Sequence, residues 1–191
     1  MFSRTFNESV LSLPGMSDII ELVQYPIGHY LPEYGGFTYC RHGGWYECEL
    51  QSNFLCAREM SGNSSAVAFA FNECVNDQLG AVSDPGHFPR LDVKGALDTC
   101  AMSQHIDPQQ LYACARERGP QLLDGTASEG NRRGVAFAPT VYINGKQMAD
   151  YTNVTLAAVC EAYKGANKPP ACSSKAAAAA PQPRAQRPCR V

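Results

Sequence analysis

Residues 137–145 read FAPTVYING, and this stretch decides the fold that the sequence predicts. After Pro139, residues 140–143 alternate as a short strand does, and Asn144-Gly145 is a strong signal for a hairpin turn. An X-Pro bond has an inexpensive cis form, and such a bond before a strand leaves the preceding backbone free to pair with an extended peptide. We therefore expect Ala138 and Pro139 to hold substrate beside a β-hairpin. The alternative is an ordinary trans proline before a surface strand.

The remaining pattern predicts elements on both sides of this stretch. Phe6 and Val10 share one face of a helix over residues 3–13, and residues 19–25 resemble a strand that stops at Pro26. Residues 29–44 have the composition of a loop, residues 124–134 are polar, and residues 146–148 begin the returning strand of the hairpin. Apolar periodicity and capping residues predict helices over residues 47–60, 66–79, 93–104, 108–119 and 153–163.

This order of elements is that of an α/β thioredoxin-like fold with a cysteine-rich helical insertion and without the first strand. We expect one N-terminally incomplete domain over residues 1–172. Residues 173–191 are a low-complexity basic tail that cannot bury a core. In thioredoxin-like domains the proline loop faces a Cys-x-x-Cys pair, yet no two cysteines of this chain are three positions apart.

Composition restricts the class of protein. With 191 residues, of which 45% are apolar and 18% charged, the chain is long enough for a globular core. Its net charge of -2 and the absence of a basic stripe argue against a nucleic-acid partner. Its apolar runs are far shorter than the roughly 18 residues that a membrane-spanning helix needs.

The cysteine content indicates the secretory route. Nine cysteines are typical of secreted or lumenal proteins, and sequons begin at Asn7, Asn63 and Asn153, so we expect a glycoprotein of the lysosome or a secreted one. Residues 1–15 do not have the pattern of a signal peptide, and we expect the chain to be incomplete at its front. Cys189, in the tail, suits an intermolecular disulfide of a dimer or a free thiol. The structural disulfide candidates, with the last two as a local bridge, are Cys40, Cys48, Cys56, Cys74, Cys100, Cys114, Cys160 and Cys172.

A second stretch, CRHGGWYEC over residues 40–48, resembles the signature of the gamma-interferon-inducible lysosomal thiol reductase family. That signature is Cys-Gln-His-Gly, two residues, Glu-Cys, two residues, Asn. Arg41 replaces the glutamine, one extra residue precedes the glutamate, and Gln51 stands near the asparagine position. The resemblance extends over most of residues 6–172, including Tyr25-Pro26-Ile27-Gly28 and the C-terminal portion. The matching motif residues are Cys40, His42, Gly43, Glu47 and Cys48.

A zinc site at Cys40, His42, Cys48 and Cys56 is a weaker alternative. Zinc sites usually combine two ligand pairs, each two to four residues apart, and only Cys40 and His42 are that close. We therefore expect no metal, and the thiol chemistry that the family resemblance implies needs no bound cofactor.

The resemblance implies an enzyme, a thiol-disulfide oxidoreductase that reduces protein disulfides in an acidic lysosomal or secretory compartment. Its family carries Cys-x-x-Cys with a phenylalanine three positions after the second cysteine. If Phe6 is that phenylalanine, Ser3 occupies the second cysteine position and the first precedes Met1. No catalytic cysteine can then be assigned within this chain, and the pair is expected upstream of Phe6. The alternative is a redox-inactive, disulfide-stapled thioredoxin-fold protein that binds peptides or unfolded proteins.

Overall fold

The computed structural model describes residues 6–26, 28–31, 37–40, 45–79, 92–135, 139–149 and 154–173, with only the backbone at 28–31, 37–40, 45 and 46. The chain divides into two compact units. The first, here called the terminal unit, combines Met1–Glu21 with Phe137–Val191, and the second, the helical unit, is Leu22–Ala136. Each unit is described by itself.

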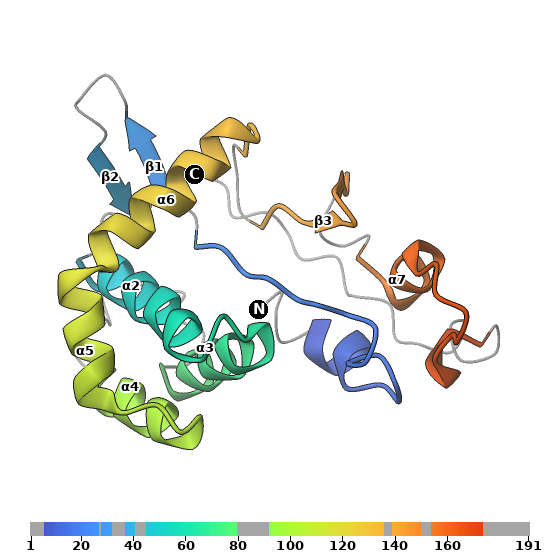
Figure 1. Cartoon of the computed structure of the whole chain (residues 1–191), viewed down its shortest axis with the longest axis horizontal. Coiled ribbons are helices and arrows are strands. Elements are labelled where there is room, and N and C mark those ends of the chain that lie inside the picture. Colours follow the sequence, from blue (N-terminus) through green and yellow to red (C-terminus); the bar gives the residue numbers. More distant parts are fainter. Residues whose placement is uncertain are drawn as a thin grey trace. The chain divides into compact units, whose positions relative to one another are not determined.

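The helical unit is built around one central helix. The helix α2 packs against α3, α5 and α6, and α4 packs against α3 and α5 (Figure 1). The short strands β1 and β2 form an antiparallel hairpin whose register runs from Gly28 opposite Cys40 to Leu31 opposite Phe37. The elements are β1 Gly28–Leu31, β2 Phe37–Cys40, α2 Trp45–Met60, α3 Ser65–Leu79, α4 Val93–Ser103, α5 Pro108–Glu117 and α6 Gly119–Arg132.

The core of this unit lies where α2 to α5 meet. Phe71 is fully buried and makes an edge-on contact with Phe54, with ring centroids 5.8 Å apart. Two disulfides cross the core, Cys56–Cys114 between α2 and α5 and Cys74–Cys100 between α3 and α4. The buried residues of the cluster are Cys56, Ala57, Phe71, Val75, Val93, Leu97, Cys100, Ala101, Ile106 and Leu111.

Three helices of this unit end in the same way. After α2, the amide of Asn63 donates to the carbonyl of Arg58 and that of Gly62 to Glu59, which is the hydrogen-bond pattern of a Schellman motif. The left-handed position of the motif is Gly62 after α2, His105 after α4 and Gly134 after α6, with φ of 67°, 58° and 68°. The helix ends are therefore fixed by local backbone chemistry.

The terminal unit joins the front of the chain to its end. The short helix η1 (Asn7–Leu11) buries Phe6 and Val10, and the following turn buries Met16. The Sδ atom of Met16 lies 3.9 Å from Sγ of Cys172, which is disulfide-bonded to Cys160. The other elements of this unit are β3 Tyr142–Ile143, β4 Lys146–Gln147, α7 Leu156–Ala162 and η5 Pro170–Cys172.

The prediction of an α/β thioredoxin-like fold is wrong. The described residues are mostly helical, and their strands form two separate two-stranded antiparallel hairpins, β1–β2 and β3–β4, in place of a central sheet. All of the hairpin β1–β2 except Gly28 falls within residues 29–44, where the Gly, Pro and Tyr content predicts a loop. Of the basic tail predicted over residues 173–191, only Ser173 lies among the described residues.

The strand predicted over residues 19–25 is also wrong, because no strand is present there. Its last residues are held by side chains of the helical unit. Oε1 of Gln24 accepts a hydrogen bond of 2.8 Å from the side-chain amide of Asn72, and the guanidinium of Arg58 lies 5.3 Å from the ring centre of Tyr25. Side-chain contacts with α2 and α3 replace the backbone pairing that the apolar run suggests.

The helix α6 is the main element absent from the sequence prediction. Gly119-Pro120 predicts the end of a helix, but the structure begins α6 there, since a proline in the first turn loses no intrahelical hydrogen bond. The buried residues of α6 are Gly119, Leu123 and Ala127, four residues apart on one face. The helices predicted over 47–60, 66–79, 93–104 and 108–119 are confirmed to within a few residues, as are the hairpin at Asn144-Gly145 and the last helix.

Gly119 allows α6 to approach α2 closely, and this contact gives the first prediction. A Cβ atom at residue 119 would lie 2.7 Å from both Cβ and Oγ of the buried Ser52. We expect Gly119→Ala to lower the free energy of unfolding by about 1–3 kcal/mol because of this overpacking. The measurement is equilibrium urea unfolding.

Gly125 is the matched control, because a Cβ there meets nothing within 4 Å. We expect Gly125→Ala to raise the free energy of unfolding by about 0.5–1 kcal/mol, the usual gain of Ala over Gly in a helix. Ser52→Gly should restore stability to the Gly119→Ala variant. Equal effects of the two alanine substitutions would contradict the close contact.

Candidate functional site

The last two residues of the family motif have described side chains, and both lie at the start of α2. Glu47 and Cys48 lie in its first turn, where an acidic side chain is favourable beside the positive end of the helix dipole. The side-chain amide of Gln51 donates to Oε1 of Glu47 at 3.3 Å. The residue near the family's asparagine position therefore contacts the motif glutamate one turn away.

Several predicted site residues lie outside the described residues or side chains. The backbone of Cys40 ends strand β2, but its side chain is not described. The site residues in this position are Ser3, Cys40, His42, Gly43, Ala138, Asn153 and Cys189.

Pro139 is half-buried in the terminal unit, directly before the β3–β4 hairpin. The amide of Met148 donates to the carbonyl of Val141 at 2.9 Å and extends the hairpin by one pair. Asn144 and Gly145 have φ of 48° and 80°, and two successive left-handed residues are typical of a type I′ turn. The side-chain amide of Asn144 donates to the carbonyl of Ala162 at 3.0 Å, so the turn is fixed on α7. The strand after Pro139 is thus held at its far end.

Every cysteine whose side chain is described is disulfide-bonded. Cys160 and Cys172, predicted as a local bridge, are joined to each other across α7 and η5. Cys48 is also disulfide-bonded, and the other pairs are Cys56–Cys114 and Cys74–Cys100. The described residues therefore contain no free thiol that could attack a disulfide.

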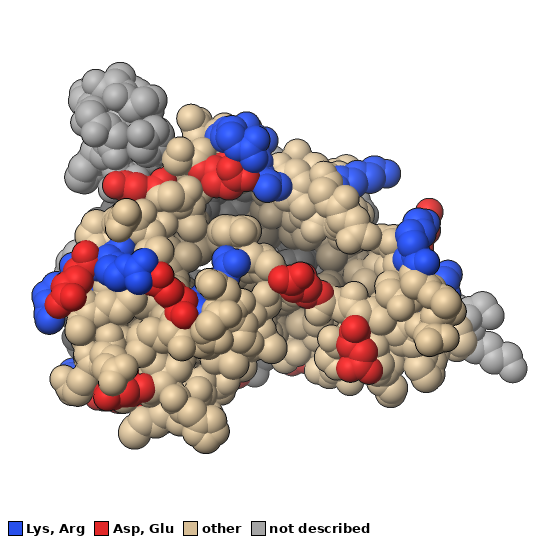
Figure 2. All heavy atoms as spheres, viewed as in Figure 1, with Lys and Arg blue, Asp and Glu red and all other residues tan. Residues whose placement is uncertain are grey.

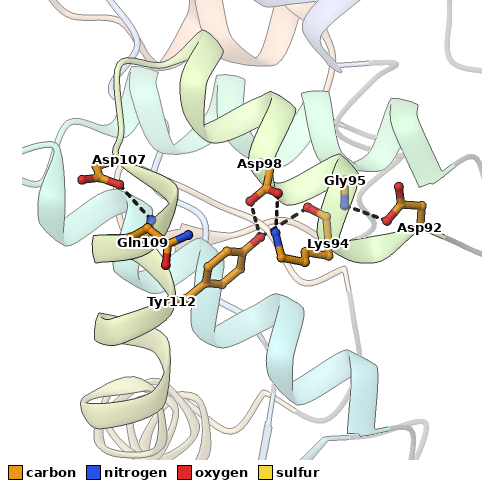
Figure 3. Close-up of polar contacts among 7 residues, drawn as sticks. All are labelled: Asp92, Lys94, Gly95, Asp98, Asp107, Gln109 and Tyr112. Carbon is orange, nitrogen blue, oxygen red and sulfur yellow. Dashed lines mark hydrogen bonds and ion pairs between the residues drawn. The ribbon is translucent and has the colours of Figure 1, made fainter.

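A polar cluster that the sequence does not single out joins α4 to α5 (Figure 3). Oδ2 of Asp98 accepts from Nζ of Lys94 at 2.6 Å, and its Oδ1 accepts from the hydroxyl of Tyr112 at 2.7 Å. The hydrogen bond from Lys94 and then that from Tyr112 hold the pKa of Asp98 below its usual value. Burial and the hydrogen bond to Asp98 raise the pKa of Tyr112. Lys94 lies on the same helix as Asp98, whereas the hydrogen bond from Tyr112 crosses from α5 to α4. The bond between Tyr112 and Asp98 therefore makes the cluster a structural clamp between the two helices.

Two carboxylate side chains cap the helices of this clamp. Asp92 accepts from the amide of Gly95 at the start of α4, and Asp107 accepts from the amide of Gln109 at the start of α5, both at 2.8 Å (Figure 3). Such caps satisfy amides that have no partner within the helix. The sequence predicts the cap at Asp107 from the Asp-Pro step, and the structure confirms it.

Acidic and basic side chains are interspersed on the face shown in Figure 2. Glu59 of α2 pairs with Arg118 between α5 and α6, with 2.5 Å between the charged atoms. Hydrogen bonds from Arg132 and Arg133 lower the pKa of the half-buried Glu129 to about 2. This alternation of charge is typical of a solvated surface held by local ion pairs.

The described side chains and helices lack two other kinds of site. No group of three or more His, Cys, Asp or Glu side chains is arranged there to bind a metal ion. No helix among the described residues has the length and apolar character needed to cross a membrane.

The Asp98 clamp predicts a pH-dependent effect on stability. Because the pKa of Asp98 is lower in the folded state, its contribution is present above the unfolded-state pKa of about 3.9 and is lost as the pH falls through the folded-state pKa. We expect Asp98→Asn to destabilise the protein at neutral pH and less so below about pH 4. Urea unfolding of both proteins across this pH range measures the difference.

Tyr112→Phe supplies the control for this experiment, since it removes one donor to Asp98 without changing charge. The effects of Asp98→Asn and Tyr112→Phe should be less than additive in the double variant, because both break the same hydrogen bond. An effect of Asp98→Asn that is constant from acidic to neutral pH would show that the carboxylate does not stabilise the fold.

Comparisons of the chain with protein-family models, with curated proteins and with solved structures found no match. The likeness to the thiol reductase family therefore rests on the motif residues and on the cysteine and proline positions given above. The family, and the activity that it implies, are accordingly proposals for this chain.

Proposed function

We propose that this chain belongs to a thiol-disulfide oxidoreductase of the gamma-interferon-inducible lysosomal thiol reductase type. Its substrates are the disulfides of unfolding proteins in an acidic lysosomal or secretory compartment. The observation that carries the proposal is the CRHGGWYEC stretch at the entrance to α2, together with cysteines downstream that are paired as structural disulfides. Disulfides persist in oxidising compartments, which supports the secretory route.

The proposal assigns the redox step to a Cys-x-x-Cys pair on the N-terminal side of Phe6, as the resemblance implies. A free thiol with a pKa of about 8.5 is almost fully protonated in an acidic compartment, so the attacking cysteine needs a lowered pKa. Its thiolate attacks one sulfur of the substrate disulfide and displaces the other as a thiol after protonation. The second cysteine then attacks the mixed disulfide, releases the reduced substrate and leaves the pair oxidised.

The described parts of the chain have supporting roles in this proposal. Pro139, with Ala138 before it in the sequence, is proposed to hold an extended segment of substrate. The hairpin that follows Pro139 is fixed on α7 by Asn144. The disulfides brace the helices, and their pairing keeps these cysteines out of the reaction. No bound cofactor is required, because the electrons come from the thiol pair.

A second candidate is a redox-inactive, disulfide-stapled protein that binds peptides or unfolded proteins. The observation that favours it is that every cysteine with a described side chain is disulfide-bonded. In this case the proline loop would bind a segment of a peptide or an unfolded protein, and no disulfides would be exchanged.

Restoring the cysteine pair tests the proposal directly. A cysteine placed immediately before Met1, combined with Ser3→Cys, gives Cys-Met-Phe-Cys with Phe6 three positions after the second cysteine. We expect this variant to reduce insulin disulfides at about pH 5 in the presence of a small-thiol reductant, because it supplies an attacking and a resolving thiol. The unaltered 191-residue chain should give only the background rate of the reductant.

Two single changes are the controls. The added cysteine with Ser3 unchanged should form mixed disulfides that resolve slowly, and Ser3→Cys without the added cysteine should not accelerate reduction. If the variant with both cysteines retains its native disulfides and is still inactive, while the unaltered chain binds reduced insulin chains, the second candidate is supported. Rapid reduction by the unaltered chain would contradict the assignment of the redox step to the N-terminal side of Phe6.

A further inference from the structure

The turn between α2 and α3 presents one of the three sequons, Asn63-Ser64-Ser65. Asn63 is exposed and has a φ of 65°, and its backbone amide is held by the carbonyl of Arg58 at 2.9 Å. Its neighbour Gly62 has open space around it, since a Cβ there would meet nothing within 4 Å. The backbone of this turn is therefore fixed, while the space beside it is open.

The Asn7 sequon has a different environment. Asn7 is half-buried in η1, directly after the buried Phe6 and on the same short helix as the fully buried Val10. Its Oδ1 accepts a hydrogen bond of 3.4 Å from the hydroxyl of Ser12, and its carbonyl accepts one of 2.9 Å from the amide of Ser12. The side chain of Asn7 is thus partly covered and its amide oxygen is hydrogen-bonded, whereas the side chain of Asn63 is exposed. Asn153, which begins the remaining sequon, lies outside the described residues.

We propose that Asn63 carries an N-linked oligosaccharide and that Asn7 does not. The donor is a lipid-pyrophosphate-linked oligosaccharide, and a transferase of the secretory route catalyses the step. The amide nitrogen Nδ2 of Asn63 forms a bond to C1 of the first sugar, the bond from C1 to the pyrophosphate oxygen breaks, and the amide proton is lost to a base. The lipid pyrophosphate leaves and no group is oxidised or reduced. This inference rests on the secretory location in the proposed function.

Asn63 also suits the turn itself, because asparagine adopts left-handed φ more readily than most residues. A substitution of Asn63 would therefore mix the loss of a glycan with strain in the turn. Ser65→Ala avoids this problem, since it removes the sequon and leaves Asn63 in place. Ser65 is the first residue of α3, where alanine is a good helix former, and the capping contact from the amide of Val67 to the hydroxyl of Ser64 is retained.

The experiment expresses the 191-residue chain behind a cleavable signal peptide in mammalian cells. The secreted protein is analysed by intact mass before and after glycan removal by peptide N-glycosidase, which converts a glycosylated asparagine to aspartate. We expect Asn63 to be converted, and the corresponding oligosaccharide mass to be lost in Ser65→Ala. Ser9→Ala, which removes the Asn7 sequon, is the matched control and should leave the mass of the attached oligosaccharide unchanged.

The outcomes separate this inference from the proposed function. An unmodified Asn63 in secreted, disulfide-bonded protein would overturn the inference, as would a glycan on Asn7. Because the signal peptide is supplied, this readout does not depend on any reduction of disulfides. Failure of the insulin assay would therefore leave the Asn63 result intact, and an unmodified Asn63 would leave the insulin result intact.

Discussion

Two disulfides in the buried core of the helical unit hold its helices together, and the rest of that unit depends on them. Cys56 and Cys100 are fully buried, and the bonds Cys56–Cys114 and Cys74–Cys100 span 58 and 26 residues of sequence. From loop-closure entropy, bonds across loops of this length contribute about 3–4 kcal/mol each. A surface ion pair such as Glu59–Arg118 contributes about 0–1 kcal/mol. The covalent bonds therefore outweigh the surface charges in fixing how α2 to α5 pack.

The paired state of the cysteines restricts the reactions in which they can take part. A disulfide-bonded cysteine is not available as a nucleophile, and all the described cysteine side chains are disulfide-bonded. The proposed reductase needs its reacting pair elsewhere, and a binding protein needs none. Disulfide chemistry, more than the hairpins or the surface charge, distinguishes the two candidates.

The local elements of the fold could be predicted where one residue type determines the geometry. Asn144-Gly145 supplied the two left-handed residues of the turn, and Asp107-Pro108 supplied a cap and a proline for the first turn of α5. The helix α6 was hidden by its glycines and polar residues, although Gly119, Leu123 and Ala127 follow a helical spacing. Its position depends on the contact between Gly119 and Ser52, which no local pattern records.

The fold class could not be predicted from the order of elements, because tertiary contacts replaced sheet pairing. Gln24 bonds to Asn72 of α3, and Tyr25 contacts Arg58 of α2, so a segment with the composition of a strand has no strand partner. Of the candidate site, Cys160–Cys172 was foreseeable because the two cysteines are only 12 residues apart, one in α7 and the other at the end of η5. The other pairings were not, since eight cysteines permit many connectivities and the sequence does not distinguish them.

The cysteine connectivity is the most direct test of this account. The measurement is peptide mass spectrometry of the non-reduced protein after its free thiols have been alkylated, with the reduced protein as the reference. We expect peptides that link Cys56 to Cys114, Cys74 to Cys100 and Cys160 to Cys172, with none of these six residues alkylated. Alkylation of any of them, or a different set of linked peptides, would contradict the assignment of these cysteines to the framework of the fold.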